Sequence, residues 1–136
     1  MKNNTIKWGI IGLGKIANKF ATDLAIVENT QLVAVASRSQ YKADKFAAKF
    51  NVENTYKSYE KLAKDSAVDA VYIATPHSFH KEYALLCMQN KKAVLCEKPF
   101  AMNLQEVEEI IATARENNVL LMEALWTFFY LILSMF

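Results

Sequence analysis

A lysine and a glutamate stand side by side in the segment Cys96-Glu97-Lys98-Pro99, directly after a short apolar run. A lysine in a partly desolvated cleft can donate a hydrogen bond to a substrate oxygen or take part in proton transfer. We therefore expect Lys98 to be the catalytic residue. A simple exposed ion pair between Glu97 and Lys98 is the alternative, and their spacing alone does not decide between the two.

The segment Thr75-Pro76-His77-Ser78-Phe79-His80 carries two histidines and also follows an apolar run. Pro76 and Pro99 are the only prolines of the chain, and each lies just past an expected strand. Ligands of open α/β sheets bind outside the carboxyl ends of the strands. Both segments are therefore candidates for a ligand-binding edge. Each histidine could equally be a helix cap or a surface residue, and that interpretation stays open.

All three glycines of the chain, Gly9, Gly12 and Gly14, fall within six residues. Residues 12–17 fit the pattern G-x-G-x-x-G/A between an expected strand and an expected helix. In that pattern Gly12 makes the tight turn, Gly14 lets backbone amides approach a pyrophosphate, and the small Ala17 allows close packing of helix on strand. The helix amino terminus adds oriented N–H donors. An incidental glycine turn is the alternative. Further expected cofactor contacts in this loop are Leu13, Lys15 and Ile16.

The second expected strand ends in Ala36-Ser37-Arg38-Ser39, where an NAD-binding site would carry an acidic residue for the ribose 2′-hydroxyl. A neutral hydroxyl followed by a guanidinium, with Lys42 one helical turn beyond, suits a 2′-phosphate through charge-assisted hydrogen bonds. The pattern favours NADP as cofactor over NAD. An arginine in a solvated surface loop is the alternative.

Short apolar or β-branched runs alternate along the chain with segments whose apolar residues recur at helical spacing. The runs predict buried strands, and the spacing predicts amphipathic helices. Their alternation indicates right-handed βαβ units. We expect an α/β fold with a doubly wound, mainly parallel Rossmann-type sheet and helices on both faces. Strands are expected at 6–11, 32–36, 55–58, 70–74, 94–96 and 119–122, and helices at 16–27, 41–50, 79–90 and 104–114, with a small helix after the strand at 55–58. Asn103 and Glu106 resemble a capping box for the last helix.

The composition is that of a globular domain, with 53% hydrophobic and 22% charged residues. A net charge of +2 is too small to indicate nucleic-acid or membrane-surface binding. The two cysteines, Cys87 and Cys96, lack metal-ligand spacing, so we expect no metal site and a reduced, cytoplasmic chain. The amino-terminal residues 1–7 lack the apolar core of a signal peptide.

These motifs together resemble the amino-terminal domain of the glucose-fructose oxidoreductase/inositol dehydrogenase family (Gfo/Idh/MocA). The resemblance covers about residues 5–127 and rests on the glycine loop, the Thr75-Pro76 loop and above all Glu97-Lys98-Pro99. The segment 122–127 resembles the branch that contains dimeric dihydrodiol dehydrogenase and NADP-dependent sugar dehydrogenases. The resemblance implies reversible hydride transfer between a nicotinamide cofactor and a carbinol carbon of a sugar, polyol or dihydrodiol. It gives Lys98 the catalytic role, with bonds to the nicotinamide ribose and to the reacting oxygen. It gives Glu97 a part in holding the cofactor, and the loop from Thr75 to His80 a place beside the nicotinamide.

Members of that family are much longer, and their second α+β domain supplies dimerisation and much of the substrate pocket. We therefore expect residues 1–123 to form the dinucleotide-binding domain and the apolar residues 124–136 to begin a missing domain, as in a truncated chain. A membrane helix over 119–136 is disfavoured, because it would place Glu123 in lipid. Three functions stay open: the cofactor-binding part of an NADP-dependent oxidoreductase, a non-catalytic nucleotide-binding module, and a non-functional fragment. Homo-oligomers are expected of the full-length relatives.

Overall fold

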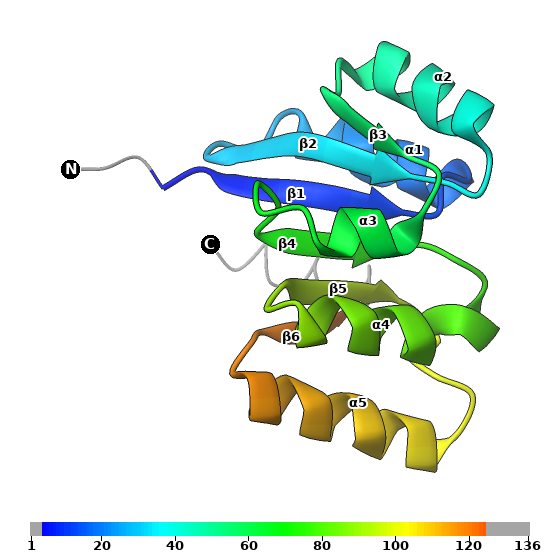
Figure 1. Ribbon diagram of the computed structural model, residues 1–136, viewed down its shortest axis with the longest axis vertical. Coiled ribbons are helices and arrows are strands. Elements are labelled where there is room, and N and C mark those ends of the chain that lie inside the picture. Colours follow the sequence, from blue (N-terminus) through cyan, green and yellow to red (C-terminus); the bar gives the residue numbers. More distant parts are fainter. Residues whose placement is uncertain (1–3, 125–136) are drawn as a thin grey trace.

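Parallel strands form the centre of the molecule, and helices lie on both sides of them (Figure 1). The computed structural model describes residues 4–124, and within that range six strands pair in the order β3-β2-β1-β4-β5-β6. Every pairing between neighbouring strands is parallel. The strands are β1 (Ile6–Ile11), β2 (Thr30–Ala36), β3 (Asn54–Tyr56), β4 (Ala70–Ile73), β5 (Ala93–Glu97) and β6 (Leu121–Ala124).

Two helices cover one face of the sheet and three cover the other. The first group is α1 (Lys15–Leu24) and α2 (Gln40–Phe50), and the second is α3 (Tyr59–Ala63), α4 (His80–Gln89) and α5 (Leu104–Asn117). A short 3-10 helix, η1 (His77–Phe79), precedes α4. The expected doubly wound α/β architecture with a parallel sheet is therefore confirmed.

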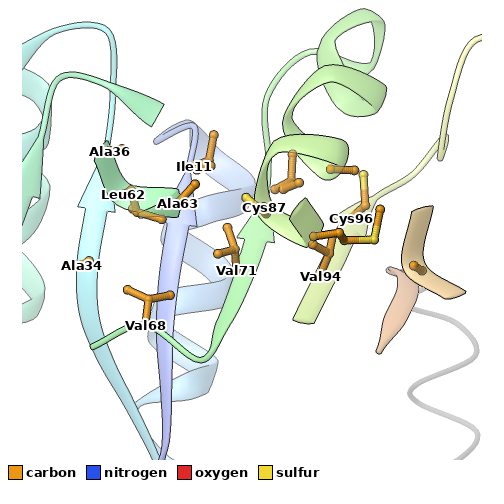
Figure 2. Close-up of a cluster of buried hydrophobic side chains, with 14 of the residues drawn as sticks. Ile11, Ala34, Ala36, Leu62, Ala63, Val68, Val71, Cys87, Val94 and Cys96 are labelled. Carbon is orange, nitrogen blue, oxygen red and sulfur yellow. The ribbon is translucent and has the colours of Figure 1, made fainter. Parts of the chain in front are cut away.

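Each face of the sheet has its own core. Under α1 and α2, the ring of Phe20 packs on that of Tyr72 with centroids 4.0 Å apart. The opposite core packs Leu62 of α3 and Cys87 of α4 against strand residues such as Val71 (Figure 2). Ile10 and Ile11 at the end of β1 and all four residues of β4 are buried, and they face the two cores in turn, as in the centre of a parallel sheet.

The register of the sheet brings the carboxyl ends of the strands into one row. Ile11 of β1 pairs with Ala36 of β2 and with Ile73 of β4. Ile73 in turn pairs with Cys96 of β5. The loops that follow β1, β2, β4 and β5 therefore leave the sheet at the same edge, although they lie far apart in the sequence.

The expected helix ends and strand ends were partly wrong. The helix expected over 16–27 ends at Leu24, and Val27 is half exposed. The cause is Thr30, whose hydroxyl donates to the carbonyl oxygens of Leu24 at 3.1 Å and Val27 at 2.9 Å and so fixes a turn. The helix expected from Phe79 begins at His80, the strand expected at 55–58 spans Asn54–Tyr56, and the strand expected at 119–122 spans Leu121–Ala124.

The expected cap of α5 is present in a variant form. Asn103 Oδ1 accepts from the backbone N–H of Glu106 at 3.0 Å. Glu106 Oε1 accepts from the backbone N–H of Met102 at 2.9 Å, one residue before the position that a standard capping box uses. Both side chains therefore satisfy backbone donors at the start of α5.

Among residues 4–124, no helix has the length and apolar character needed to cross a membrane. The apolar tail expected at 124–136 lies outside the described residues, apart from Ala124.

Candidate functional site

The loop after β1 contains a position that only glycine can occupy. Gly12 has a φ of +89°, in the left-handed region. A Cβ on Gly12 would lie 2.9 Å from the backbone C and O of Ala74 and from the backbone N of Thr75. The backbone N–H of Gly12 donates to the carbonyl of Ala36 at 3.2 Å. The loop is thus pressed between the ends of β2 and β4, as the sequence predicts for the tight turn.

Gly14 begins α1 and faces open space. It is the N-cap residue of the helix, and its side chain, having no heavy atom, gives no capping hydrogen bond. Apart from its neighbours in the chain, no described residue comes within 4 Å of a Cβ built on Gly14. The first N–H groups of a helix lack intrahelical partners and carry a partial positive charge. This end of α1 therefore offers oriented donors and room for an anionic group.

Ala17 is fully buried against the sheet, as expected for the small residue that closes the glycine pattern. Leu13 and Ile16 are half-buried, and Lys15, the first residue of α1, is exposed.

The turn after β2 is held by two serines. Ser37 is buried, and its Oγ accepts from the backbone N–H of Ser39 at 3.2 Å. Ser39 Oγ caps α2 by accepting from the backbone N–H of Lys42 at 3.3 Å. Arg38 and Lys42 are exposed at the same turn. The Arg38 guanidinium lies over the ring of Phe79, with the carbon Cζ 5.0 Å from the ring centroid.

Thr75, after β4, carries a buried hydroxyl without a partner. The residue is 8% exposed, and no described residue hydrogen-bonds to its Oγ1. A buried polar atom without a partner is uncommon and usually points to a bound group or water. Because the Thr75 backbone N adjoins Gly12, this orphaned hydroxyl lies beside the glycine loop. Pro76 and His77 follow on the exposed side of the same loop.

His80 joins the loop after β4 to the loop after β5. The residue is 1% exposed, with Nε2 2.8 Å from the carbonyl of Thr75 and Nδ1 2.8 Å from the carbonyl of Pro99. Both partners are acceptors, so a ring with a single N–H can donate only one of the two bonds. The structure thus places His80 behind the edge as a connector, and its expected contact with a cofactor stays a prediction.

Glu97, at the end of β5, is held by a tyrosine. The hydroxyl of Tyr72, from β4, donates to Glu97 Oε2. Burial raises the pKa of Tyr72, and the adjacent Glu97 carboxylate raises it further, so the phenol stays protonated as the donor. Among residues 4–124, the ion pairs do not include Glu97 with Lys98. The exposed ion pair considered from the sequence is therefore not formed, and Lys98 is exposed at the edge.

The loop that carries Lys98 is also held from β6. Glu123 Oε2 accepts from the backbone N–H of Phe100 at 2.7 Å, two residues after Lys98. A carboxylate accepting from an N–H makes a charge-assisted hydrogen bond, which is stronger than a neutral one. Three different elements therefore anchor this loop: β4 holds Glu97, α4 holds Pro99 and β6 holds Phe100. Lys98 lies between these anchors.

The site residues spread along one row of strand ends. Arg38 and Lys42 follow β2, the glycine loop follows β1, Thr75 follows β4, and Lys98 follows β5. With neighbouring strands about 4.8 Å apart, β2 and β5 are separated by roughly 14 Å. The arrangement suits an extended ligand whose anionic centre lies over the start of α1. One end of such a ligand would lie beside Arg38 and Lys42, and the other beside Lys98. An intact dinucleotide has these features, and the orphaned Thr75 hydroxyl and the open Gly14 position fit it.

Four residues at this edge were missed by reasoning from the sequence. Tyr72 and Glu123 hold the loop of Lys98, while Phe79 and Tyr59 lie beside Arg38. Phe79 and Tyr72 lie within or next to segments that the sequence singled out, but no spacing rule pairs them with their partners. Tyr59 and Glu123 gave no signal of a role at the site.

Comparison with known proteins shows a match over nearly the whole described chain. Residues 6–125 match the family model GFO_IDH_MocA, described as an oxidoreductase family with an NAD-binding Rossmann fold. The mouse trans-1,2-dihydrobenzene-1,2-diol dehydrogenase is 50% identical over 127 residues, which are 92% of this chain and 38% of the mouse protein. The scyllo-inositol 2-dehydrogenase (NADP(+)) IolU of Bacillus subtilis is 47% identical over 91% of this chain and 38% of its own length. The chain thus spans less than two fifths of the curated relatives it matches.

Solved structures agree with the fold. The 3-ketoreductase KijD10 of Actinomadura kijaniata, in complex with NADP and TDP-benzene, superposes with a TM-score of 0.85 at 34% identity, over 89% of this chain and 37% of that one. The scyllo-inositol dehydrogenase of Lactobacillus casei, with bound NAD(H) and scyllo-inositol, superposes with a TM-score of 0.82 at 25% identity, over 88% and 36%.

Proposed function

Because the chain belongs to the Gfo/Idh/MocA oxidoreductase family, with its NAD-binding Rossmann fold, we propose that it is the cofactor-binding part of an NADP-dependent dehydrogenase. Its cofactor lies along the row of strand ends, with the pyrophosphate over the start of α1. The reaction is hydride transfer to or from a carbinol carbon of a sugar, polyol or dihydrodiol. The relatives that support this substrate class are named for a dihydrodiol and for scyllo-inositol.

The observation that carries the choice of NADP is the turn after β2. A carboxylate at this turn would accept from the 2′-hydroxyl of NAD and repel a 2′-phosphate. The chain instead has Ser37, whose buried hydroxyl serves the turn, followed by Arg38 and with Lys42 at the start of α2. Two cations beside a neutral turn favour a dianionic phosphate through charge-assisted hydrogen bonds.

The chemistry belongs to the other end of the row. A nicotinamide bound there would supply the hydride chemistry. Lys98 is exposed at the end of β5, where its ammonium can donate to the oxygen of the reacting carbinol carbon and exchange the proton that this oxygen loses or gains. Tyr72 fixes the carboxylate of Glu97, and Glu123 fixes the backbone of Phe100, so the loop that carries the lysine is held on both sides of it. In this assignment Glu97, Thr75, Pro76, His77 and His80 border the nicotinamide half of the cofactor, whereas the Phe79 ring faces Arg38.

The test of the cofactor assignment is a titration of the chain with NADPH and with NADH, followed by cofactor fluorescence. One charge-assisted hydrogen bond contributes about 1.5–3 kcal/mol, so the 2′-phosphate should favour NADPH by roughly 10- to 100-fold. Arg38→Gln should remove most of that preference. Lys7→Gln is the matched control, because it removes one positive charge at the opposite edge of the sheet, where Lys7 is exposed near the start of β1.

Hydride transfer is tested separately, by following the absorbance of the reduced cofactor while the chain is incubated with NADP and scyllo-inositol or a dihydrodiol. Turnover would exclude a purely non-catalytic nucleotide-binding module. Binding of NADPH without turnover of any polyol or diol would restrict the function to cofactor binding.

A further inference from the structure

We propose that the aromatic ring of Phe79, supported by Tyr59, holds the Arg38 guanidinium in place for the 2′-phosphate, so that these two residues help determine NADP selectivity. This inference rests on the proposed function, since it names residues that act through Arg38. Phe79 and Tyr59 are positioning residues, because neither needs to touch the cofactor.

The contact that carries the proposal is a cation–π pair between two strand ends. Arg38 follows β2 and Phe79 ends η1 after β4, and the guanidinium carbon lies 5.0 Å from the ring centroid. In the sheet β1 lies between β2 and β4, so this pair connects the two loops that flank the glycine loop. A cation–π contact uses the charge of the guanidinium and does not consume its N–H donors, which can still bind a phosphate.

Tyr59 belongs to the same group of aromatic rings as Phe79, joined to it through Tyr83. Burial raises the pKa of the Tyr59 phenol and the neighbouring Tyr83 adds to the rise, while Arg38 opposes it. The Arg38 charge is therefore close enough to act on the Tyr59 hydroxyl. The Tyr59 ring meets the Tyr83 ring edge-on, with centroids 4.6 Å apart, and Phe79 stacks near Tyr83 at 6.2 Å. We call these three rings, Tyr59, Phe79 and Tyr83, the aromatic platform.

The platform is fixed to the rest of the structure. The backbone N–H of Phe79 donates to the carbonyl of Pro76 at 3.0 Å. The next residue is the buried His80, which is bound to the carbonyls of Thr75 and Pro99. The Phe79 ring therefore extends from a segment that is hydrogen-bonded on both sides.

The backbone of Arg38 is fixed as well. Ser37 is buried and bonds the N–H of Ser39, while Ser39 caps α2. With its backbone held by this turn and its guanidinium in contact with the platform, Arg38 has less rotamer freedom than an arginine without such contacts. Freedom that is already lost in the free protein is not lost again on binding, so a preorganised side chain binds more tightly.

The experiment compares the ratio of the NADH and NADPH dissociation constants across variants. Phe79→Leu removes the ring face. It should raise the dissociation constant of NADPH by about two- to fivefold, the range of an exposed cation–π pair, and leave the dissociation constant of NADH unchanged. Phe79→Tyr keeps the ring face and should restore the wild-type ratio. Tyr59→Phe keeps the platform packed and removes only the hydroxyl, and it should lower the ratio by a smaller factor.

Phe50→Leu is the matched control. Lys49 lies over the Phe50 ring at 5.1 Å from the centroid, so the same substitution removes a cation–π pair of the same kind at the far end of α2. It should leave both dissociation constants unchanged.

The outcomes separate this inference from the proposed function. If the wild-type chain binds NADPH and NADH equally, the assignment of NADP is wrong. Suppose instead that the wild type prefers NADPH while Phe79→Leu leaves the ratio of the NADH and NADPH dissociation constants unchanged, raises it, or weakens the binding of both cofactors equally. In each of these cases Arg38 acts without the platform, and this inference is overturned. A lowered ratio in Phe79→Leu that Phe79→Tyr restores supports it.

Discussion

Replacing Gly14 with alanine separates the stability of the fold from the binding of a dinucleotide. Gly14 has φ −89° and ψ −162°, an extended conformation that alanine also adopts. Because no described residue apart from its neighbours in the chain lies within 4 Å of the added Cβ, the methyl group enters open space rather than the core. If the pyrophosphate lies over the start of α1, that open space is where the cofactor comes closest to the backbone.

The expected change in stability is small, because two effects oppose each other. Alanine restricts the unfolded chain more than glycine does, which stabilises the fold by about 0.4–1 kcal/mol. Alanine is also a poorer N-cap than glycine, at a cost of roughly the same size. The free energy of unfolding should therefore stay within about 0.5 kcal/mol of the wild type, and Tm within roughly 2 °C. Binding should weaken more, because losing one charge-assisted hydrogen bond raises Kd by roughly 10- to 100-fold.

Gly12→Ala is the matched variant. In contrast to Gly14→Ala, its main effect should be a loss of stability. A left-handed backbone at a non-glycine residue costs about 1–2 kcal/mol. The added Cβ also meets the backbone of Ala74 and Thr75 at 2.9 Å, which cannot give way as a flexible side chain can. We expect a loss of at least about 2 kcal/mol and a fall in Tm of roughly 5–10 °C.

Thermal unfolding followed by circular dichroism and NADPH titration by fluorescence measure both quantities on each variant. An unchanged NADPH affinity in Gly14→Ala would refute the placement of the pyrophosphate over α1. A fall in Tm as large as that of Gly12→Ala would refute the claim that the space beside Gly14 is open.

Other predictions concern Lys98, its loop and the cysteines. Lys98→Ala should change the free energy of unfolding by less than about 0.5 kcal/mol and leave NADPH affinity nearly unchanged, while abolishing any hydride transfer; retained turnover would refute its catalytic role. Glu123→Leu should speed amide hydrogen exchange at Phe100 by roughly 10- to 100-fold, whereas Glu123→Gln keeps an acceptor and should change it little; equal rates in both variants would contradict the anchor. Burial raises the pKa of Cys87 and Cys96 from 9.0 to about 12, so both thiols stay protonated in the fold. The free energy of unfolding should therefore fall as pH rises from about 9 towards 12, measured by urea denaturation, with a shallower fall in Cys87→Ala.

The architecture could be predicted from the sequence because its signals are local. A buried parallel strand is a continuous apolar run, and a glycine loop followed by a helix is readable without knowing what lies beside it. The glycine pattern around residue 12 is local in the sequence, whereas the backbone atoms that exclude a Cβ there belong to Ala74 and Thr75, which the fold brings beside it.

The contacts that organise the site could not be predicted, because they depend on which strands become neighbours. Tyr72 donates to Glu97 across 25 residues, and Phe100 donates to Glu123 across 23. Both bonds follow from the order β4-β5-β6, which no periodicity in the sequence states. For the same reason Arg38 could be expected either in solvent or at a phosphate, but its stacking on Phe79 could not be foreseen.

The assignment of His80 shows the limit of a motif. Its position after the Thr75-Pro76 loop indicates a ligand edge, and the structure does place it at that edge of the sheet. The side chain is nevertheless buried between two backbone carbonyls. A histidine in this spacing can therefore serve the site by joining its loops, a role that residue type and spacing do not distinguish from ligand contact.

The most direct test of the account is the pair of dissociation constants for NADPH and NADH, measured on the wild-type chain under the same salt conditions. We expect saturable binding of both cofactors, with NADPH tighter by at least about tenfold, the effect of one charge-assisted hydrogen bond to the 2′-phosphate. Equal affinities, tighter binding of NADH, or binding of neither cofactor would contradict it.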